Sequence, residues 1–115
     1  MPDIPPAALP APVRHYLDAH RAHDTTTALA SFTPDATVTD DGTTHAGTAD
    51  IAAWLARAYT AHTRTEILSG GHCDDETHCA VTLRLSGDIP GGEVDLAHSF
   101  TLRDGLIYTL TIAPA

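Results

Sequence analysis

Three polar side chains in this 115-residue sequence stand where they could act on a substrate. Asp40 ends a short, alternating, β-branched segment, and a carboxylate in an apolar pocket can serve as a general base. Tyr16 lies on the apolar face of a predicted helix, with a hydroxyl that can donate a hydrogen bond. His98 alternates with Phe100 and Leu102 on a predicted strand, so it points inward if Phe100 does. A base among hydrogen-bond donors can remove a proton next to a carbonyl while the donors hold the carbonyl oxygen.

Each of the three residues also has a purely structural interpretation. Asp40 precedes the turn sequence Asp41-Gly42 and could be an exposed turn residue that accepts hydrogen bonds from backbone amides. A buried Tyr16 needs only a backbone acceptor, and a lone His98 among apolar neighbours could belong to the core. If Asp40 ionises beside His98, each would stabilise the charge of the other.

Apolar and aromatic residues on the predicted helices and strands could line a pocket around these three side chains. The same residues could equally form an ordinary core. They are Phe32, Val38, Trp54, Tyr59, Leu83, Phe100, Tyr108 and Leu110.

The predicted elements place helices first and strands afterwards. Helical spacing of apolar residues predicts helices over 13–23, 28–32 and 49–59, with Asp24 and Thr48 as N-caps. The predicted strands are rich in β-branched or alternating residues and lie over 36–40, 43–46, 63–73, 79–86, 93–103 and 106–112. We expect an α+β fold with the helices packed on one face of a strongly curved antiparallel sheet. An opening at one end of such a sheet favours a small-molecule pocket.

Composition predicts a soluble single domain. Apolar residues make up 43% and charged residues 18%, which is typical of a globular chain. The formal net charge is −9 and the few arginines are scattered, so we expect neither nucleic acid nor a membrane surface as a partner. Residues 1–11 form a Pro-rich, flexible leader and 12–115 a single domain, without a signal-peptide pattern or a transmembrane run. We therefore expect a cytoplasmic protein.

Histidines and cysteines superficially suggest zinc. The pairs His72-Cys73 and His78-Cys79 flank a tight turn. On alternating strands each histidine faces away from its neighbouring cysteine, so four ligands would not converge. We expect two free thiols, no metal and no organic cofactor.

Segments 13–24, 29–40, 47–54 and 98–107 resemble the NTF2-like superfamily, and within it the SnoaL-like polyketide cyclases and ketosteroid isomerases. The resemblance covers about residues 12–113 and implies a cone-shaped α+β fold. That fold hosts isomerases, cyclases, epoxide hydrolases, dehydratases and non-catalytic binders, so it does not by itself fix the function.

Two isomerase positions are matched by motif. Tyr16 resembles the tyrosine that donates a hydrogen bond to the substrate oxygen, and Asp40, closing Ala36-Thr37-Val38-Thr39, resembles the aspartate that shuttles a proton. His98 stands where the isomerases have a protonated aspartate, Asp41 where a proline usually follows the base, and Leu55 where a supporting tyrosine falls.

The resemblance implies a cofactor-free enzyme that transfers a proton on a hydrophobic carbonyl compound, such as a polyketide or a steroid-like ring. Asp40 would be the proton shuttle, with Tyr16 and His98 as donors to the oxygen. One alternative is a non-catalytic domain that binds an apolar ligand or a partner subunit. Another is an epoxide-opening enzyme, to which Arg84 and Asp95 could contribute. An exposed sheet face opposite the helices would favour a homodimer.

Overall fold

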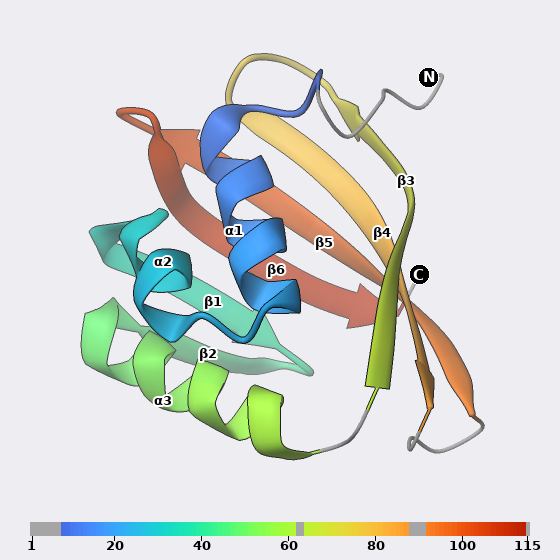
Figure 1. Ribbon diagram of the computed structural model, residues 1–115. Coiled ribbons are helices and arrows are strands. Elements are labelled where there is room, and N and C mark those ends of the chain that lie inside the picture. The colour runs from blue at the N-terminus through green and yellow to red at the C-terminus, as the bar shows by residue number, and fades with distance from the viewer. Residues whose placement is uncertain (1–7, 62–63, 88–91, 115) are drawn as a thin grey trace.

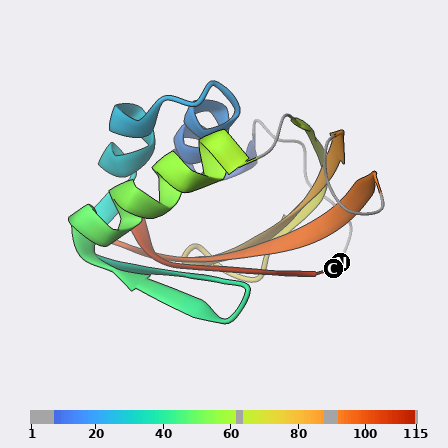
Figure 2. The same ribbon diagram turned by 90° about the horizontal axis from the view of Figure 1, so that it is seen from below.

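Three helices in the described part of the chain lie on one face of a curved, six-stranded sheet, which confirms the predicted α+β fold (Figures 1 and 2). The structure is a computed structural model that describes residues 8–61, 64–87 and 92–114. The elements are α1 (Ala11–Arg21), α2 (Thr25–Ala30), β1 (Phe32–Asp40), β2 (Thr43–Ala46), α3 (Gly47–Ala61), β3 (Arg64–Cys73), β4 (His78–Gly87), β5 (Glu93–Arg103) and β6 (Leu106–Pro114). No helix among these residues is long and apolar enough to cross a membrane.

The strand order places β1, the first strand of the chain, beside β6, the last. The sheet runs β2-β1-β6-β5-β4-β3, and its neighbours pair antiparallel except for β1 and β6, which are parallel. Parallel neighbours need a long crossover, and here the chain passes through β2, α3 and the β3–β5 meander before β6 returns. The last residues of β1 therefore lie beside those of β6 in the middle of the sheet.

Two helix starts follow from local chemistry. Asp24 caps α2, because its side chain accepts from the Thr27 amide at 3.2 Å and from the Thr27 hydroxyl at 2.7 Å. This cap starts the helix earlier than predicted and leaves Phe32 to open β1. The prediction that Thr48 caps α3 is wrong: the helix already begins at Gly47, whose φ of +84° a glycine adopts without a Cβ clash.

The predicted leader is shorter than expected. Its first seven residues lie outside the described residues, but Leu9 is 3% exposed and belongs to the hydrophobic core. The Leu9 carbonyl accepts a hydrogen bond from Nε of Arg14 at 2.9 Å. An apolar side chain among the prolines thus anchors the chain to α1, so the fold begins before residue 12.

The prediction of two free thiols is wrong. Cys73 and Cys79 face each other directly across the β3–β4 hairpin, with a Cα–Cα distance of 4.0 Å, and form a disulfide. The hairpin register puts both side chains on the same face, which the alternation of each strand taken separately did not show.

Candidate functional site

Asp40 lies in a row of residues that crosses three neighbouring strands. In β1 the alternating residues Ala36 and Val38 are fully buried under the helices, and Asp40 continues this face. Asp40 pairs with Ile112 of β6, and Ile112 pairs with His98 of β5. Directly paired residues point to the same face of a sheet, so these three side chains share the helix-covered face. We call Asp40, Ile112 and His98 the Asp40 row.

The Asp40 carboxylate is held from the helical side. Trp54 of α3 is 5% exposed, and its indole Nε1 donates to Oδ2 of Asp40 at 3.0 Å. The His45 ring of β2 stacks near the same indole, with 6.1 Å between ring centroids. Asp40 is therefore a half-buried, oriented carboxylate and not an exposed turn residue. The hydrogen bond leaves the second carboxylate oxygen, Oδ1, for another donor.

The hairpin after Asp40 explains this geometry. Asp41 and Gly42 have φ values of 52° and 78°, as a tight two-residue hairpin turn requires. This turn fixes the pairing of Asp40 with Thr43 and of Val38 with His45. Local turn chemistry thus places both the carboxylate and the His45 ring next to α3.

His98 is buried and uncharged at neutral pH. The residue is only 3% exposed, and burial lowers the pKa of its imidazole from 6.5 to about 4. A hydrogen bond with the Leu96 carbonyl, at 3.4 Å from Nδ1, and the charge of Asp40 both raise the pKa, but burial outweighs them. The negative charge of Asp40 thus favours the protonated form of His98, but less strongly than burial disfavours it.

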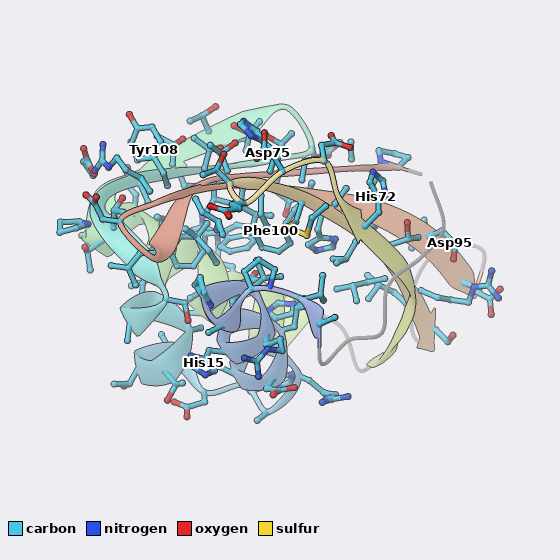
Figure 3. All side chains as sticks on the ribbon, turned by 90° about the horizontal axis from the view of Figure 1, so that it is seen from above. His15, His72, Asp75, Asp95, Phe100 and Tyr108 are labelled. Atoms are coloured by element: carbon cyan, nitrogen blue, oxygen red, sulfur yellow. A yellow bond between two sulfur atoms is a disulfide. The ribbon has the colours of Figure 1, made fainter. Side chains whose placement is uncertain are left out.

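Tyr16 reaches the row through an aromatic cluster. It is fully buried on α1, and its ring packs edge-on against Phe32 at 5.3 Å and Phe100 at 5.9 Å between centroids. The Phe100 ring stacks in turn beside His98 at 6.5 Å. Figure 3 shows Phe100 on the side of the sheet that faces the helices. The structure thus brings Asp40 and His98 together on one row and joins Tyr16 to them through Phe100.

Most of the predicted pocket walls lie on this covered face. The buried ones among them are Phe32, Val38, Trp54, Leu83, Phe100 and Leu110. The side chain of Tyr59 lies outside the described residues. The prediction for Tyr108 is wrong: its ring lies on the opposite face of the sheet, beneath the Arg103 guanidinium at 4.1 Å (Figure 3). A register shift between β5 and β6 at Thr101/Leu102 interrupts the alternation that the sequence pattern assumed.

Arg84 and Asp95 do not contribute to the site. Their side chains form two hydrogen bonds with each other, at 2.8 and 3.1 Å, and both alternate with residues that face the helices. They therefore lie on the face opposite to Asp40. The epoxide-opening alternative, which needed this pair inside, is not supported by the structure.

The sequence does not predict the hydrogen-bonding role of Trp54, nor the places of Ile112 and His45 in the site. Trp54 was expected only as an apolar wall, whereas its indole N–H is the hydrogen-bond donor to Asp40. Ile112 separates Asp40 from His98, and His45 stacks near Trp54. The Asp41-Gly42 turn, taken as a two-residue hairpin loop, would have given the His45–Val38 pairing in advance.

A curved sheet with helices on one face and polar side chains on that covered face defines the NTF2-like class of α+β domains. The sequence matches the SnoaL-like domain over residues 13–110, and the chain belongs to this family. A solved protein from Sinorhizobium meliloti, named as a candidate polyketide cyclase, is 34% identical, with a TM-score of 0.89. The match covers 96% of this chain and 100% of that one.

More distant solved structures share the fold. A protein with a ketosteroid isomerase-like fold from Catenulispora acidiphila, in complex with trimethylamine, is 20% identical with a TM-score of 0.78; the match covers 94% of this chain and 88% of that one. A Mycobacterium tuberculosis protein in complex with estradiol-17β-hemisuccinate is 19% identical with a TM-score of 0.75, over 90% of this chain and 91% of that one. The comparison with curated proteins found no match.

Proposed function

We propose that this protein is a cofactor-free enzyme that transfers a proton on a hydrophobic carbonyl compound, such as a polyketide or a steroid-like ring. The observation that carries the proposal is the oriented Asp40 carboxylate, held by Trp54 at 3.0 Å on the helix-covered face together with the buried His98. The name of the S. meliloti relative and the steroid ester bound by the M. tuberculosis relative support the substrate class.

In this proposal Asp40 is the base. It takes a proton from the carbon next to the carbonyl. The C–H electron pair forms a double bond to the carbonyl carbon, and the C=O π pair moves onto the oxygen, which becomes an enolate oxygen. The Tyr16 hydroxyl is the proposed donor to that oxygen. Asp40 then returns the proton to another carbon. Alternatively, the enolate carbon attacks a second carbonyl and closes a ring, and the alkoxide oxygen that forms takes the proton from Asp40. Since Ile112 lies within the row and the buried pair Val38 and Leu110 lies next to it, hydrogen bonds to a bound substrate there would be stronger than in water.

Trp54 has a positioning role in the same proposal. A carboxylate that is free to rotate loses part of its advantage as a base, because a reacting group must be held near the atom it attacks. The indole N–H fixes one oxygen and so presents the other.

The test is exchange of carbon-bound protons. Bicyclic ketones are incubated in D₂O with the wild type, Asp40→Asn and Asp95→Asn, and exchange is followed by NMR. We expect Asp40→Asn to lose roughly 100-fold or more of the exchange rate while keeping ketone affinity. Asp95→Asn removes an outer-face carboxylate and should change the rate less than about twofold. Ketone binding without exchange in the wild type would contradict the enzyme and favour the non-catalytic binder.

We also propose that two copies pair through the sheet faces that bear no helix. Small polar residues prevail on this face of the central strands, among them Thr39, Ser99, Thr109 and Thr111. Light scattering of the full chain is expected to give twice the 12.1 kDa chain mass. A monomer at micromolar concentration would refute the dimer.

A further inference from the structure

The hydrogen bond of His98 fixes which ring nitrogen carries the proton. A neutral imidazole has one N–H and one lone-pair nitrogen. Nδ1 of His98 contacts the Leu96 carbonyl at 3.4 Å, and a carbonyl oxygen only accepts hydrogen bonds. Nδ1 is therefore the protonated nitrogen, and Nε2 holds the lone pair. In this state Nε2 accepts a hydrogen bond and does not donate one to a substrate oxygen.

The lone-pair nitrogen lies on the inner side of the site. Within an imidazole, Nε2 is farther from Cβ than Nδ1, and the His98 side chain lies on the helix-covered face of β5, in register with Ile112. One face of the ring is next to Phe100, and the carboxylate of Asp40 acts on it electrostatically from two strands away. The row therefore presents two acceptors, a carboxylate oxygen and Nε2, on either side of Ile112.

Two acceptors cannot satisfy each other, and the Trp54 N–H already donates to Oδ2. Among the described residues, Nε2 of His98 is not one of the fully enclosed polar atoms that lack a hydrogen-bond partner, so a ligand can reach it and supply a donor. We infer that the Asp40 row takes its ligand through a hydroxyl group that donates to Nε2 of His98, so that the substrate is an enol, a phenol or an alcohol on an apolar ring.

This inference deepens the proposed function at the same site, because it names a hydroxyl beside the reacting carbon. His98 would hold that hydroxyl, which leaves Asp40 for the proton on carbon. It also changes the role of His98. The resemblance implied that His98 donates a hydrogen bond to an oxyanion, whereas here it accepts a hydrogen bond and so selects the substrate.

The tautomer can be measured in the wild-type chain. Imidazole ¹⁵N chemical shifts distinguish a protonated from a lone-pair nitrogen, and a His98→Gln sample identifies which of the eight histidine signals belongs to His98. We expect protonated Nδ1 and unprotonated Nε2 at pH 7. A protonated Nε2 would overturn the inference, whatever the result of the proton-exchange test.

The second test compares two ligands that differ in one group, 2-decalol and 2-decalone. We expect the wild type to bind the alcohol about tenfold more tightly than the ketone, which is the effect of one buried hydrogen bond. His98→Phe should remove this preference, and Asp40→Asn should keep it. Equal binding in the wild type, or a preference that survives in His98→Phe, would refute the inference. A preference for the alcohol without any proton exchange would uphold it while the proposed enzyme fails.

Discussion

The two faces of the sheet differ in how far their titratable side chains are exposed to water. On the outer face Arg84 and Asp95 pair at 2.8 Å, with side chains 45% and 37% exposed, and Arg103 pairs with Asp35. On the inner face Asp40 has a tryptophan as its partner, and His98 is buried with its charge lost. Exposed ion pairs are screened by water and contribute little to stability, so the outer pairs need no function to explain them. The polar groups on the inner face depend on hydrogen-bond partners, which Trp54 provides for Asp40 and the Leu96 carbonyl for His98.

The pKa shifts on the two faces have different causes. A hydrogen bond from Arg84 holds the pKa of Asp95 below its usual value, because the charged form is stabilised. Burial lowers the pKa of His98, because its charged form is removed from water. The outer face therefore keeps its charges by pairing them, whereas the inner face keeps His98 neutral and able to accept a hydrogen bond.

The largest expected effect on stability belongs to an inner aromatic residue. Phe100→Ala should lower the free energy of unfolding by about 3–5 kcal/mol, because it removes a buried ring that contacts both Tyr16 and His98. The control is the adjacent residue Ser99, which is exposed on the outer face. Ser99→Ala should change the free energy of unfolding by less than about 0.5 kcal/mol. Denaturant unfolding measures both variants. Equal losses would show that the two faces do not differ as described.

The next effect is a dependence of stability on pH. The pKa of His98 is about 4 in the folded chain and 6.5 when unfolded, so between these values only the unfolded chain takes up the proton. The contribution of His98 to the free energy of unfolding is therefore largest above about pH 6.5. It falls by roughly 3 kcal/mol between pH 6.5 and pH 4 and does not change further below that. His98→Gln should flatten this part of the curve, and the exposed His15→Gln should keep it. An unchanged curve in His98→Gln would contradict the buried, neutral histidine.

A smaller loss is expected at the disulfide. Its cysteines are only six residues apart, and opening so short a loop should cost about 2 kcal/mol through the entropy of the unfolded chain. Thiol titration of the unfolded protein should find no free thiol before reduction and two afterwards. Two thiols before reduction would contradict the disulfide and agree with the free cysteines predicted from the sequence.

The smallest effect is expected on the outer face. Arg84→Gln breaks the pair with Asp95 and should lower the free energy of unfolding by less than about 1 kcal/mol, with less effect at high salt. Proton exchange on ketones should stay unchanged. A large loss of proton exchange would show that Arg84 and Asp95 contribute to catalysis, which would contradict their placement on the outer face.

Local sequence signals predicted much of the fold. Asp24 capped α2 as expected, and the Asp41-Gly42 turn connected two strands. The family resemblance added the helix order and the positions of Tyr16 and Asp40. Contacts between distant segments were harder to predict: the parallel β1–β6 pair, which sets Ile112 between Asp40 and His98, has no local signature.

Errors arose where one residue's surroundings depend on a neighbouring strand. Tyr108 has an aromatic side chain at a plausible position, but a register shift against β5 turned it to the outer face. The disulfide required the cross-strand register of Cys73 and Cys79, which the spacing of the cysteines alone does not give. Trp54 was predicted as a pocket wall, and its hydrogen bond to Asp40 could not be predicted because it depends on how α3 packs over β1.

A crystal structure with 2-decalol bound is the most direct test of the Asp40 row as the functional site. The account predicts that the ring lies between the sheet and the helices, with the hydroxyl oxygen within hydrogen-bond distance of Nε2 of His98. The ring carbon beside the hydroxyl-bearing carbon should face Oδ1 of Asp40, with the Trp54 hydrogen bond to Oδ2 retained. A ligand on the outer face beside Arg84 and Asp95, or an Asp40 carboxylate turned to solvent, would contradict the account.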